Sequence, residues 1–297
     1  MSILFQVIIS GLLAGGIYAL VSMGLTLVFG VMRVINFAHG EFLMLGMYAA
    51  VLLSLWLGID PYVSAAIAAP AFFGFGVLVH RTIILPLVRR GAPHSSQALA
   101  TLGLSAIIAN GVLIMASGRS QIVTTSYTTS VLRAFDLTIS VPRAFAFVAA
   151  LLTAGALYLL LNKTFTGMAI RATAQDRQAS ELLGIPTIQM DGVTFGIATA
   201  CVGIAGAIMV PFFYVHPSVG FGLGLVAYIV VVLGGMGSML GAFVGGLLIG
   251  VVEALTGYFL DPGLKELVYL IMFVAVLIFL PWGLFGIPGS EKLGEGH

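Results

Sequence analysis

Polar side chains inside long apolar runs are the first candidates for chemistry in this sequence. They are costly in a membrane and usually face a bundle interior or a water-filled cavity. Glu253 lies inside such a run, where it either lines a pathway or pairs with a neighbouring helix. Asn110 lies inside another run and is predicted to make a hydrogen bond to a second helix.

The segment from Asn36 to Glu41, NFAHGE, separates the first two apolar runs and is the other concentration of polar groups. Asn36 suits a turn, Gly40 can take a positive φ, and Glu41 suits the first turn of the next helix. The aromatic residue and the histidine of this segment are left without a structural role. The candidates for a pathway or gate are therefore Asn36, Phe37, His39, Glu41, Asn110 and Glu253.

The segment Gly167–Pro186, GMAIRATAQDRQASELLGIP, is a polar island between two long apolar runs. Its pattern predicts one helix over Arg171–Leu183, with Gly184 after its last turn and Pro186 preventing continuation. The apolar residues that can share a face are Ala172, Ala179, Leu182 and Leu183. Such a helix serves either as a linker on the lipid surface or as a docking helix for a partner, and we favour docking.

Signatures of catalysis and metal binding are missing from the sequence. No G-x-x-x-x-G-K-[ST] motif occurs, which excludes nucleotide hydrolysis by a P-loop in this chain. H-E-x-x-H and G-x-S-x-G are also missing, and the histidines are scattered without metal-ligand spacing. The single cysteine, Cys201, lies in an apolar run and is predicted to be a small buried residue. We therefore predict no catalytic residue and no metal site.

The composition determines the broad class. Hydrophobic residues make up 60% of the 297 positions, 8% are charged, and the mean hydropathy is +1.15. Soluble domains carry about a quarter charged residues, so this chain cannot build a water-facing surface. Apolar runs of 18 or more residues recur, and each is long enough to cross a bilayer. The prediction is an all-α, polytopic membrane helix bundle forming one domain over 1–297, and the net charge of +1 gives no indication of nucleic-acid binding.

Nine apolar segments can be drawn, which predicts about 8–9 transmembrane segments. They cover about 4–30, 41–58, 62–88, 97–117, 144–161, 191–213, 222–236, 239–260 and 265–281. The third contains Pro70, which predicts a tilt or a kink. The seventh is short and rich in glycine, which is typical of a re-entrant or broken segment. No basic region precedes the first, so a cleaved signal peptide is not predicted.

The connections between these segments differ in positive charge. One set holds Arg33, Arg81, Arg89, Arg90, Lys163, Arg171, Arg177 and Lys292, and the other holds Arg119, Arg133, Arg143 and Lys265. The positive-inside rule places the richer set in the cytoplasm, which predicts an external N-terminus and a cytoplasmic C-terminus. The Gly167–Pro186 helix is then cytoplasmic. The loop 118–143, with its SQIVTTSYTTS run, is external and is predicted to be extended or irregular.

Pairs of glycines four residues apart predict close helix packing. They are Gly11–Gly15, Gly192–Gly196, Gly220–Gly224, Gly241–Gly245 and Gly246–Gly250. The denser run Leu233–Gly250 predicts a broken or tightly packed pair of helices.

Three long stretches carry a family resemblance. They read GLLAGGIYALVSMGLTLVFGVMRVINFAHGEFLMLGMY, RATAQDRQASELLGIP and VVLGGMGSMLGAFVGGLLIGVVEAL. The sequence resembles the permeases of bacterial branched-chain amino acid ABC importers, of the LivH type, from Gly11 to about Phe285. ABC importer permeases carry a cytoplasmic coupling loop that reads EAA, three residues, then Gly.

In that resemblance Gln178, Ala179 and Ser180 match EAA, and Gly184 matches the final glycine. Gln replaces Glu and Ser replaces the second Ala, which puts an ion pair from the first position in doubt but not the helix–turn geometry. The residues that the resemblance assigns to coupling are Arg171, Asp176, Arg177, Gln178, Ala179, Ser180, Glu181 and Gly184. The helix is expected to lie in a groove of an ATP-binding subunit, whose closure moves the attached spans.

The resemblance also implies the partners. They are a homologous LivM-like permease or a second copy of this chain, two ATP-binding subunits and a periplasmic solute-binding protein. The expected location is the bacterial inner membrane, as a multi-pass protein. This chain is expected to hold no cofactor, since ATP-Mg is bound by the partner subunits. Branched-chain amino acids are the substrates implied, with a related small polar solute as an option.

A second function class remains open. A self-contained secondary transporter or channel would use Glu253 as its coupling group, although proton-coupled carriers usually show several buried acids or bases. An intramembrane enzyme is disfavoured because no nucleophile–base or metal arrangement is visible. Transport by the purified chain alone would favour the carrier, whereas co-purification with an ATPase would favour the importer permease.

Overall fold

The computed structural model describes residues 2–134 and 137–286. Its helices are α1 (Ser2–Met32), α2 (His39–Leu57), α3 (Pro61–Val79), α4 (Leu85–Arg89), α5 (His94–Met115), α6 (Val141–Lys163), α7 (Phe165–Gln175), α8 (Arg177–Leu182), α9 (Thr187–Met209), α10 (Val219–Gly234), α11 (Met239–Phe259) and α12 (Lys265–Phe279). A π-helical turn, His80–Ile84, joins α3 to α4, a 3-10 turn, Pro262–Leu264, precedes α12, and the strands are β1 (Val131–Ala134) and β2 (Leu137–Ser140). Lys292, one of the basic residues counted for orientation, lies outside the described residues.

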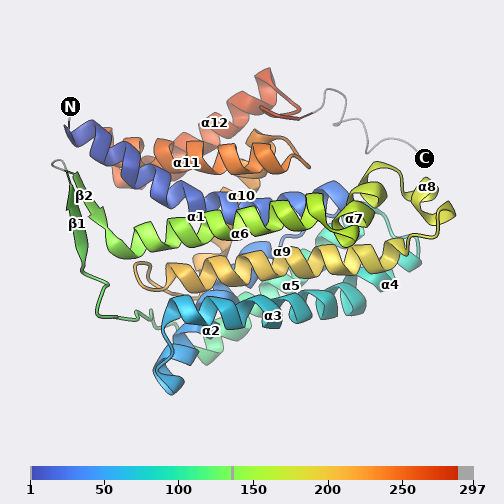
Figure 1. Cartoon of the computed structure of the whole chain (residues 1–297), viewed down its shortest axis with the longest axis horizontal. Coiled ribbons are helices and arrows are strands. Elements are labelled where there is room, and N and C mark those ends of the chain that lie inside the picture. The colour runs from blue at the N-terminus through green and yellow to red at the C-terminus, as the bar shows by residue number, and fades with distance from the viewer. Residues whose placement is uncertain (1, 135–136, 287–297) are drawn as a thin grey trace.

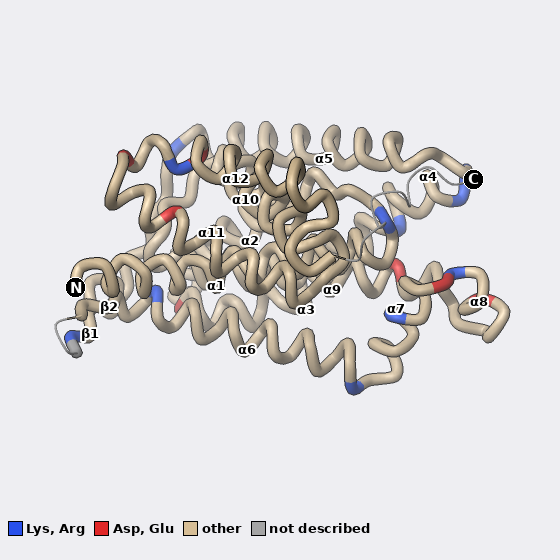
Figure 2. The backbone as a smooth tube through the Cα atoms, turned by 90° about the horizontal axis from the view of Figure 1, so that it is seen from above, with Lys and Arg blue, Asp and Glu red and all other residues tan. Residues whose placement is uncertain are grey.

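The long helices run side by side along the long axis of the molecule (Figure 1). The start of α1 and the β1–β2 hairpin form one end, which we call the hairpin end, and α4, α7 and α8 form the other, the corner end (Figure 1). Charged residues gather at these two ends, and the middle of the bundle is almost free of them (Figure 2). Within the described residues, eight helical segments are long and apolar enough to cross a membrane, so the predicted polytopic all-α bundle is confirmed.

Glycines allow the most extensive helix contact, which is between α1 and α11. A Cβ on Gly11 would stand 2.7 Å from the carbonyl oxygen of Gly250, and one on Gly15 would stand 2.8 Å from that of Gly246. These two spacings, Gly11–Gly15 and Gly246–Gly250, therefore face each other across one crossing. Because the neighbours are backbone atoms that cannot yield, a side chain at either site would separate the helices. The predicted role of these glycines is confirmed.

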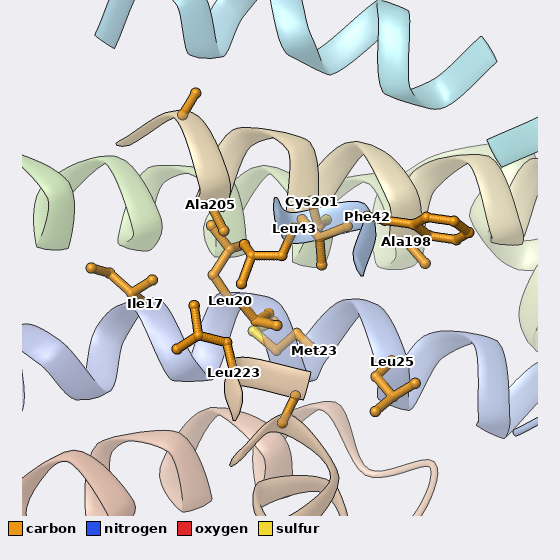
Figure 3. Close-up of a cluster of buried hydrophobic side chains, with 14 of the residues drawn as sticks. Ile17, Leu20, Met23, Leu25, Phe42, Leu43, Ala198, Cys201, Ala205 and Leu223 are labelled. Carbon is orange, nitrogen blue, oxygen red and sulfur yellow. The ribbon is translucent and has the colours of Figure 1, made fainter. Parts of the chain in front are cut away.

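The centre of the bundle is α9, which packs against α1, α2 and α3. Of its most apolar 18-residue stretch, 78% is buried, compared with 11% for α5 and 6% for α12. Side chains such as Leu20, Leu43 and Cys201 meet here from three helices (Figure 3). Cys201 is buried, as predicted. Since α9 directly follows the corner end, it connects that end to the core.

The run from Leu233 to Gly250 forms the predicted tight pair of helices. The chain turns between α10 and α11 through Gly235 (φ 102°) and Gly237 (φ 89°), both in the backbone region that favours glycine. A Cβ on Gly241 would stand 2.0 Å from the carbonyl oxygen of Gly234, so the two helices touch directly after the turn. The helix α10 has 16 residues, about 24 Å, which is less than the bilayer core. It leads from the loop after α9 to this turn and is not one of the eight described segments long enough to cross a membrane.

The third apolar segment contains both Pro70 and an irregular turn. The helix α3 continues through Pro70, and the change comes at the π-helical turn that begins at His80. Pro70 does not end the helix, since α3 extends nine residues beyond it, to Val79.

The loop 118–143 is extended, as predicted, and adds a hairpin that the sequence pattern did not predict. Val131 pairs with Ser140 and Ala134 with Leu137 in an antiparallel register. Before the hairpin, the Tyr127 hydroxyl donates a hydrogen bond of 2.6 Å to Asp60, which caps α3. Burial, together with this bond, raises the pKa of Tyr127, so the phenol stays protonated and remains a donor. The bond ties the loop to the bundle.

Candidate functional site

The polar island at the corner end is two helices instead of the predicted single helix. The helix α7 ends at Gln175, and Asp176 is extended (φ −148°, ψ 107°). The Asp176 carboxylate accepts a hydrogen bond of 2.9 Å from the Ala179 amide and so caps the N-terminus of α8. An aspartate is a strong N-cap, and its side chain competes with helical continuation. The prediction of one helix over Arg171–Leu183 is therefore wrong, because a capping residue lies in its middle.

The predicted stop after the island is confirmed. Gly184 has φ 82°, and its amide donates to the carbonyl of Glu181 at 3.0 Å. The amide of Ile185 donates to the carbonyl of Ser180 at 3.0 Å, which completes the end of α8. Pro186 follows and opens α9. Only two residues therefore separate Gly184 from α9, and α8 is held close to the central helix.

Two charged residues of α8 are turned toward the bundle. Both terminal nitrogens of Arg177 contact the carboxylate of Asp191, whose side chain is 6% exposed, on the first turn of α9. Arg177 also lies 3.6 Å from Glu181, which accepts a 2.6 Å hydrogen bond from the Thr187 hydroxyl. Arg171, on α7, donates to Asn162 of α6 at 2.9 Å. The ionic groups therefore anchor the corner to its own chain.

Two leucines at the end of α8 are exposed. Leu182 is 90% exposed and Leu183 is 81% exposed, and Gln178 and Ala179 are exposed beside them. Ser180, in contrast, is buried. Figure 2 shows α8 projecting beyond the ends of the long helices. The corner thus exposes two leucines at its outer tip.

The NFAHGE segment is buried in the bundle except for Phe37, which is exposed. His39 Nε2 is 3.0 Å from the carbonyl oxygen of Val21, which precedes the end of α1 by eleven residues, or about 16 Å. The chain therefore folds back along α1 after Met32 before α2 begins. Thr101 of α5 contacts this irregular stretch, since its hydroxyl lies 3.1 Å from the Phe37 amide and 3.1 Å from the Ile35 carbonyl. The break falls between the first two apolar segments, which the NFAHGE segment was predicted to separate.

Within this segment the turn at Asn36 is confirmed, since its side chain accepts from the Ala38 amide at 3.1 Å. Phe37 is 42% exposed, and its ring centre lies 5.5 Å from that of Tyr228. Gly40 is helical, so the predicted positive φ is wrong. Packing requires a glycine at this position, because a Cβ on Gly40 would stand 2.1 Å from the carbonyl oxygen of Gly220 on α10.

Glu41 lies in the first turn of α2, as predicted, and is 3% exposed. Its Oε2 atom has no hydrogen-bond partner among the described residues. The side chain lines a cavity of about 640 Å³ between α2, α5 and the start of α10. Asn110 lines the same cavity, but its side chain donates to Ala106 of its own helix at 2.8 Å. The predicted bond from Asn110 to another helix is therefore wrong, because α5 packs too loosely to offer a partner.

Glu253 pairs with neighbouring helices, one of the two roles predicted for it. Its carboxylate accepts a hydrogen bond of 2.6 Å from the Tyr18 hydroxyl of α1 and lies 3.1 Å from Lys265 Nζ of α12. It also lines a cavity of about 470 Å³ at the hairpin end, together with Arg143.

Four residues that matter here were not selected from the sequence: Tyr18, Thr101, Asp191 and Lys265. Asp191 begins an apolar segment and Lys265 begins another, and an ionisable residue at such a boundary is a usable signal because it needs a partner. For Tyr18 and Thr101, which resemble many other residues of apolar helices, the sequence gives no signal.

Known proteins extend these observations. Residues 7–277 match a family model described as branched-chain amino acid transport system / permease component. The chain belongs to this permease family. It is 30% identical over 303 residues to the high-affinity branched-chain amino acid transport system permease protein LivH of Salmonella typhimurium, with 97% of each chain covered. It is 32% identical over 301 residues to the corresponding protein BraD of Pseudomonas aeruginosa, also with 97% of each chain covered.

A more distant relative comes from Methanocaldococcus jannaschii. It is named a probable branched-chain amino acid transport permease protein LivH and is 31% identical over 283 residues, with 90% of this chain and 88% of the relative covered. The family match over residues 7–277 includes most of α1 and all of the NFAHGE segment, the corner and α11. The chain is thus a multi-pass membrane permease subunit and not an enzyme.

Proposed function

We propose that this permease imports a branched-chain amino acid, using ATP hydrolysed by partner subunits that dock on α7 and α8. The substrate class follows from the family and from the names of its relatives. The observation that supports the docking site is the exposed leucine pair at the tip of α8, Leu182 and Leu183. A periplasmic solute-binding protein delivers the solute, and a homologous permease or a second copy completes the pathway.

The shape of the corner suits a docking element. Helix-in-groove recognition uses an apolar face laid into a partner's groove, and two leucines at 90% and 81% exposure offer such a face. The corner is also polar elsewhere and projects beyond the bundle, so insertion in lipid is disfavoured (Figure 2). ATP and its metal ion belong to the partner in this proposal, and the permease contributes only the surface that receives the motion.

The corner is built to pass motion on. Arg177 and Asp191 join α8 to the first turn of α9 through two nitrogen–oxygen contacts, and Asp191 is nearly fully buried. Two residues, Ile185 and Pro186, link Gly184 to α9 covalently. The helix α9 is the most buried of the long helices described and packs against α1, α2 and α3. A displacement of α8 that moves α9 would therefore move its contacts with these three helices. Such an interface behaves as a near-rigid body when a partner closes.

The proposed orientation puts the corner end in the cytoplasm. Lys and Arg gather at the end formed by α4, α7 and α8, and the basic residues counted from the sequence favour the same side (Figure 2). The N-terminus and the hairpin then face the periplasm of a bacterial inner membrane, where the binding protein docks. The C-terminus is cytoplasmic.

The first test is reconstituted uptake. We expect Leu182→Glu/Leu183→Glu to lower ATP-dependent uptake of a branched-chain amino acid by at least tenfold, since charges on an apolar face prevent its burial in a groove. The matched control is Leu260→Glu, which alters a leucine 63% exposed after α11 and should leave uptake unchanged.

The readouts are uptake in proteoliposomes and the amount of ATPase subunit that co-purifies with each variant. Normal uptake by the double variant removes the docking role. Transport by the permease alone, without ATPase or ATP, supports the secondary-carrier function instead.

A further inference from the structure

The structure assigns solute recognition to the cavity beside Glu41. We propose that the Glu41 carboxylate receives the α-ammonium group of the transported amino acid on its way through the membrane. This inference rests on the proposed import function and deepens it by naming a solute-contacting residue. Its basis is the chemistry of the cavity and the unpaired state of its acid.

The cavity lining is both polar and apolar. Its polar side chains are those of Glu41, Ser105, Asn110, Ser120, His216 and Ser218, and Leu102, Ala109, Leu113 and Phe221 contribute apolar surface. Its volume of about 640 Å³ falls within the range of small-molecule sites. An amino acid with a branched aliphatic side chain has the same division, a charged backbone and an apolar side chain. The solute would fit this lining with its backbone toward Glu41 and its side chain along α5.

The charge of Glu41 requires a partner. The residue is 3% exposed, the lining of the cavity holds no lysine or arginine, and its one histidine, His216, is hydrogen-bonded through Nδ1 to the Ser218 hydroxyl at 2.9 Å. A buried carboxylate without a cation or full hydrogen bonding is costly, and such groups in membranes mark pathways. A solute ammonium group supplies both the charge and three hydrogen-bond donors. Oε2, which packs against Gly220 of α10, has no hydrogen-bond partner among the described residues, so the chain satisfies only part of the bonding capacity of this carboxyl group.

Close packing holds the acid in place. A Cβ on Gly220 would stand 2.4 Å from Glu41 Oε2, so this oxygen lies directly against the first turn of α10. The N-terminus of this 16-residue helix carries only about half a positive elementary charge, which does not neutralise an ionised carboxylate. Gly40, one residue earlier, lets α2 approach α10 at the same place. Glycines on both helices therefore position the acid.

The other two large cavities lack this property. The one at the hairpin end contains Glu253, which is already paired with Lys265 and Tyr18. The one between α1, α6 and α7, of about 650 Å³, is lined mainly by apolar residues, with Arg171 at its edge. Of these three cavities, only the one beside Glu41 combines apolar side chains with an acid that no lysine or arginine of the lining pairs with.

The experiment compares transport with ATP use in the complete transporter. Wild type, Glu41→Gln and Glu41→Asp are reconstituted with the partner subunits and leucine-loaded binding protein. We expect Glu41→Gln to lower leucine imported per ATP hydrolysed at least tenfold while hydrolysis stimulated by the binding protein stays within twofold, and Glu41→Asp to retain part of the uptake. A merely structural role would lower assembly and hydrolysis together, which would overturn the proposal.

A pair of cavity variants provides an independent test. Ala106→Phe places a ring at a residue that lines the cavity, whereas Ile107→Phe changes its neighbour, which is 71% exposed and outside that lining. Uptake should fall at least fivefold in the first variant and stay unchanged in the second. Equal uptake in both variants, or full leucine import per ATP by Glu41→Gln, rejects the site while the wild type still imports. If the wild type shows no ATP-dependent import, the proposed function fails instead.

Discussion

Glu41 of α2 and Glu253 of α11 are both glutamates of long apolar helices, and their surroundings differ. Glu253 meets Lys265 at 3.1 Å and Tyr18 at 2.6 Å, so its charge is matched by neighbouring helices. Glu41 is more deeply buried, at 3% exposure, and its Oε2 atom has no partner among the described residues. Both line cavities, yet only one of them has a charge that the surrounding chain leaves unmet.

The difference teaches how to interpret an acid in a membrane helix. A carboxylate with a cation and a phenol around it contributes to holding helices together, and here it joins α1, α11 and α12. A carboxylate packed against a helix N-terminus, with open space on its other side, keeps an unused capacity to bind. Burial alone does not separate the two cases, whereas the list of hydrogen-bond partners does.

Removing the cation of Glu253 should produce the largest effect on stability. Lys265→Met leaves a carboxylate with 18% side-chain exposure next to an apolar group. Breaking a fully buried pair costs about 3–5 kcal/mol, and the 33% exposure of Lys265 reduces the expected loss here to about 2 kcal/mol. The measurement is the free energy of unfolding of the purified permease in detergent.

The double variant Lys265→Met/Glu253→Gln is the control for this prediction. It removes both charges, so most of the lost stability should return, and the difference between single and double variants gives the interaction energy. If Lys265→Met unfolds with wild-type free energy, the pair does not stabilise the bundle and the contrast with Glu41 disappears.

A smaller effect is expected at the phenol. Tyr18→Phe removes one hydrogen bond to Glu253 but leaves Lys265 in place, so the expected loss is about 1 kcal/mol. Tyr258→Phe is a matched control, because Tyr258 lines the same cavity, is 50% exposed and makes no side-chain hydrogen bond recorded among the described residues. An equal loss in both variants would mean that packing of the ring, and not the bond to Glu253, carries the effect.

Much of the fold could be predicted because hydrophobicity and glycine spacing are local properties. Length and apolar runs gave the membrane bundle, and four-residue glycine spacing gave the contact of α1 with α11. The positive φ of Gly184 followed from its place after the last turn of a helix. The split of the corner at Asp176 was missed, because an aspartate within a polar helix face resembles any solvent-exposed residue until its side chain is seen to cap α8.

The candidate sites were predictable as locations but not as contacts. NFAHGE and the corner were both selected, yet nothing local shows that His39 reaches Val21 or that Arg177 reaches Asp191. Partners of this kind come from helices distant in sequence, and one chain without its relatives contains no signal of which helices meet. Asn110 is the converse case, since its position in an apolar run suggested a helix contact that the loose packing of α5 does not provide.

The smallest effect on stability is expected at Glu41, and it sharpens the comparison most. Glu41→Gln removes an unpaired buried charge, which favours folding, and also removes its attraction to the N-terminus of α10, worth about 0.5 kcal/mol. These terms oppose each other, so the free energy of unfolding should stay within about 0.5 kcal/mol of wild type or rise, whereas Glu253→Gln should lose more. A loss above about 1 kcal/mol in Glu41→Gln would show that the acid holds the helices together as Glu253 does. A neutral result means that the bundle keeps this charge at no benefit to its own stability, which is the property expected of a group whose partner is the passing solute.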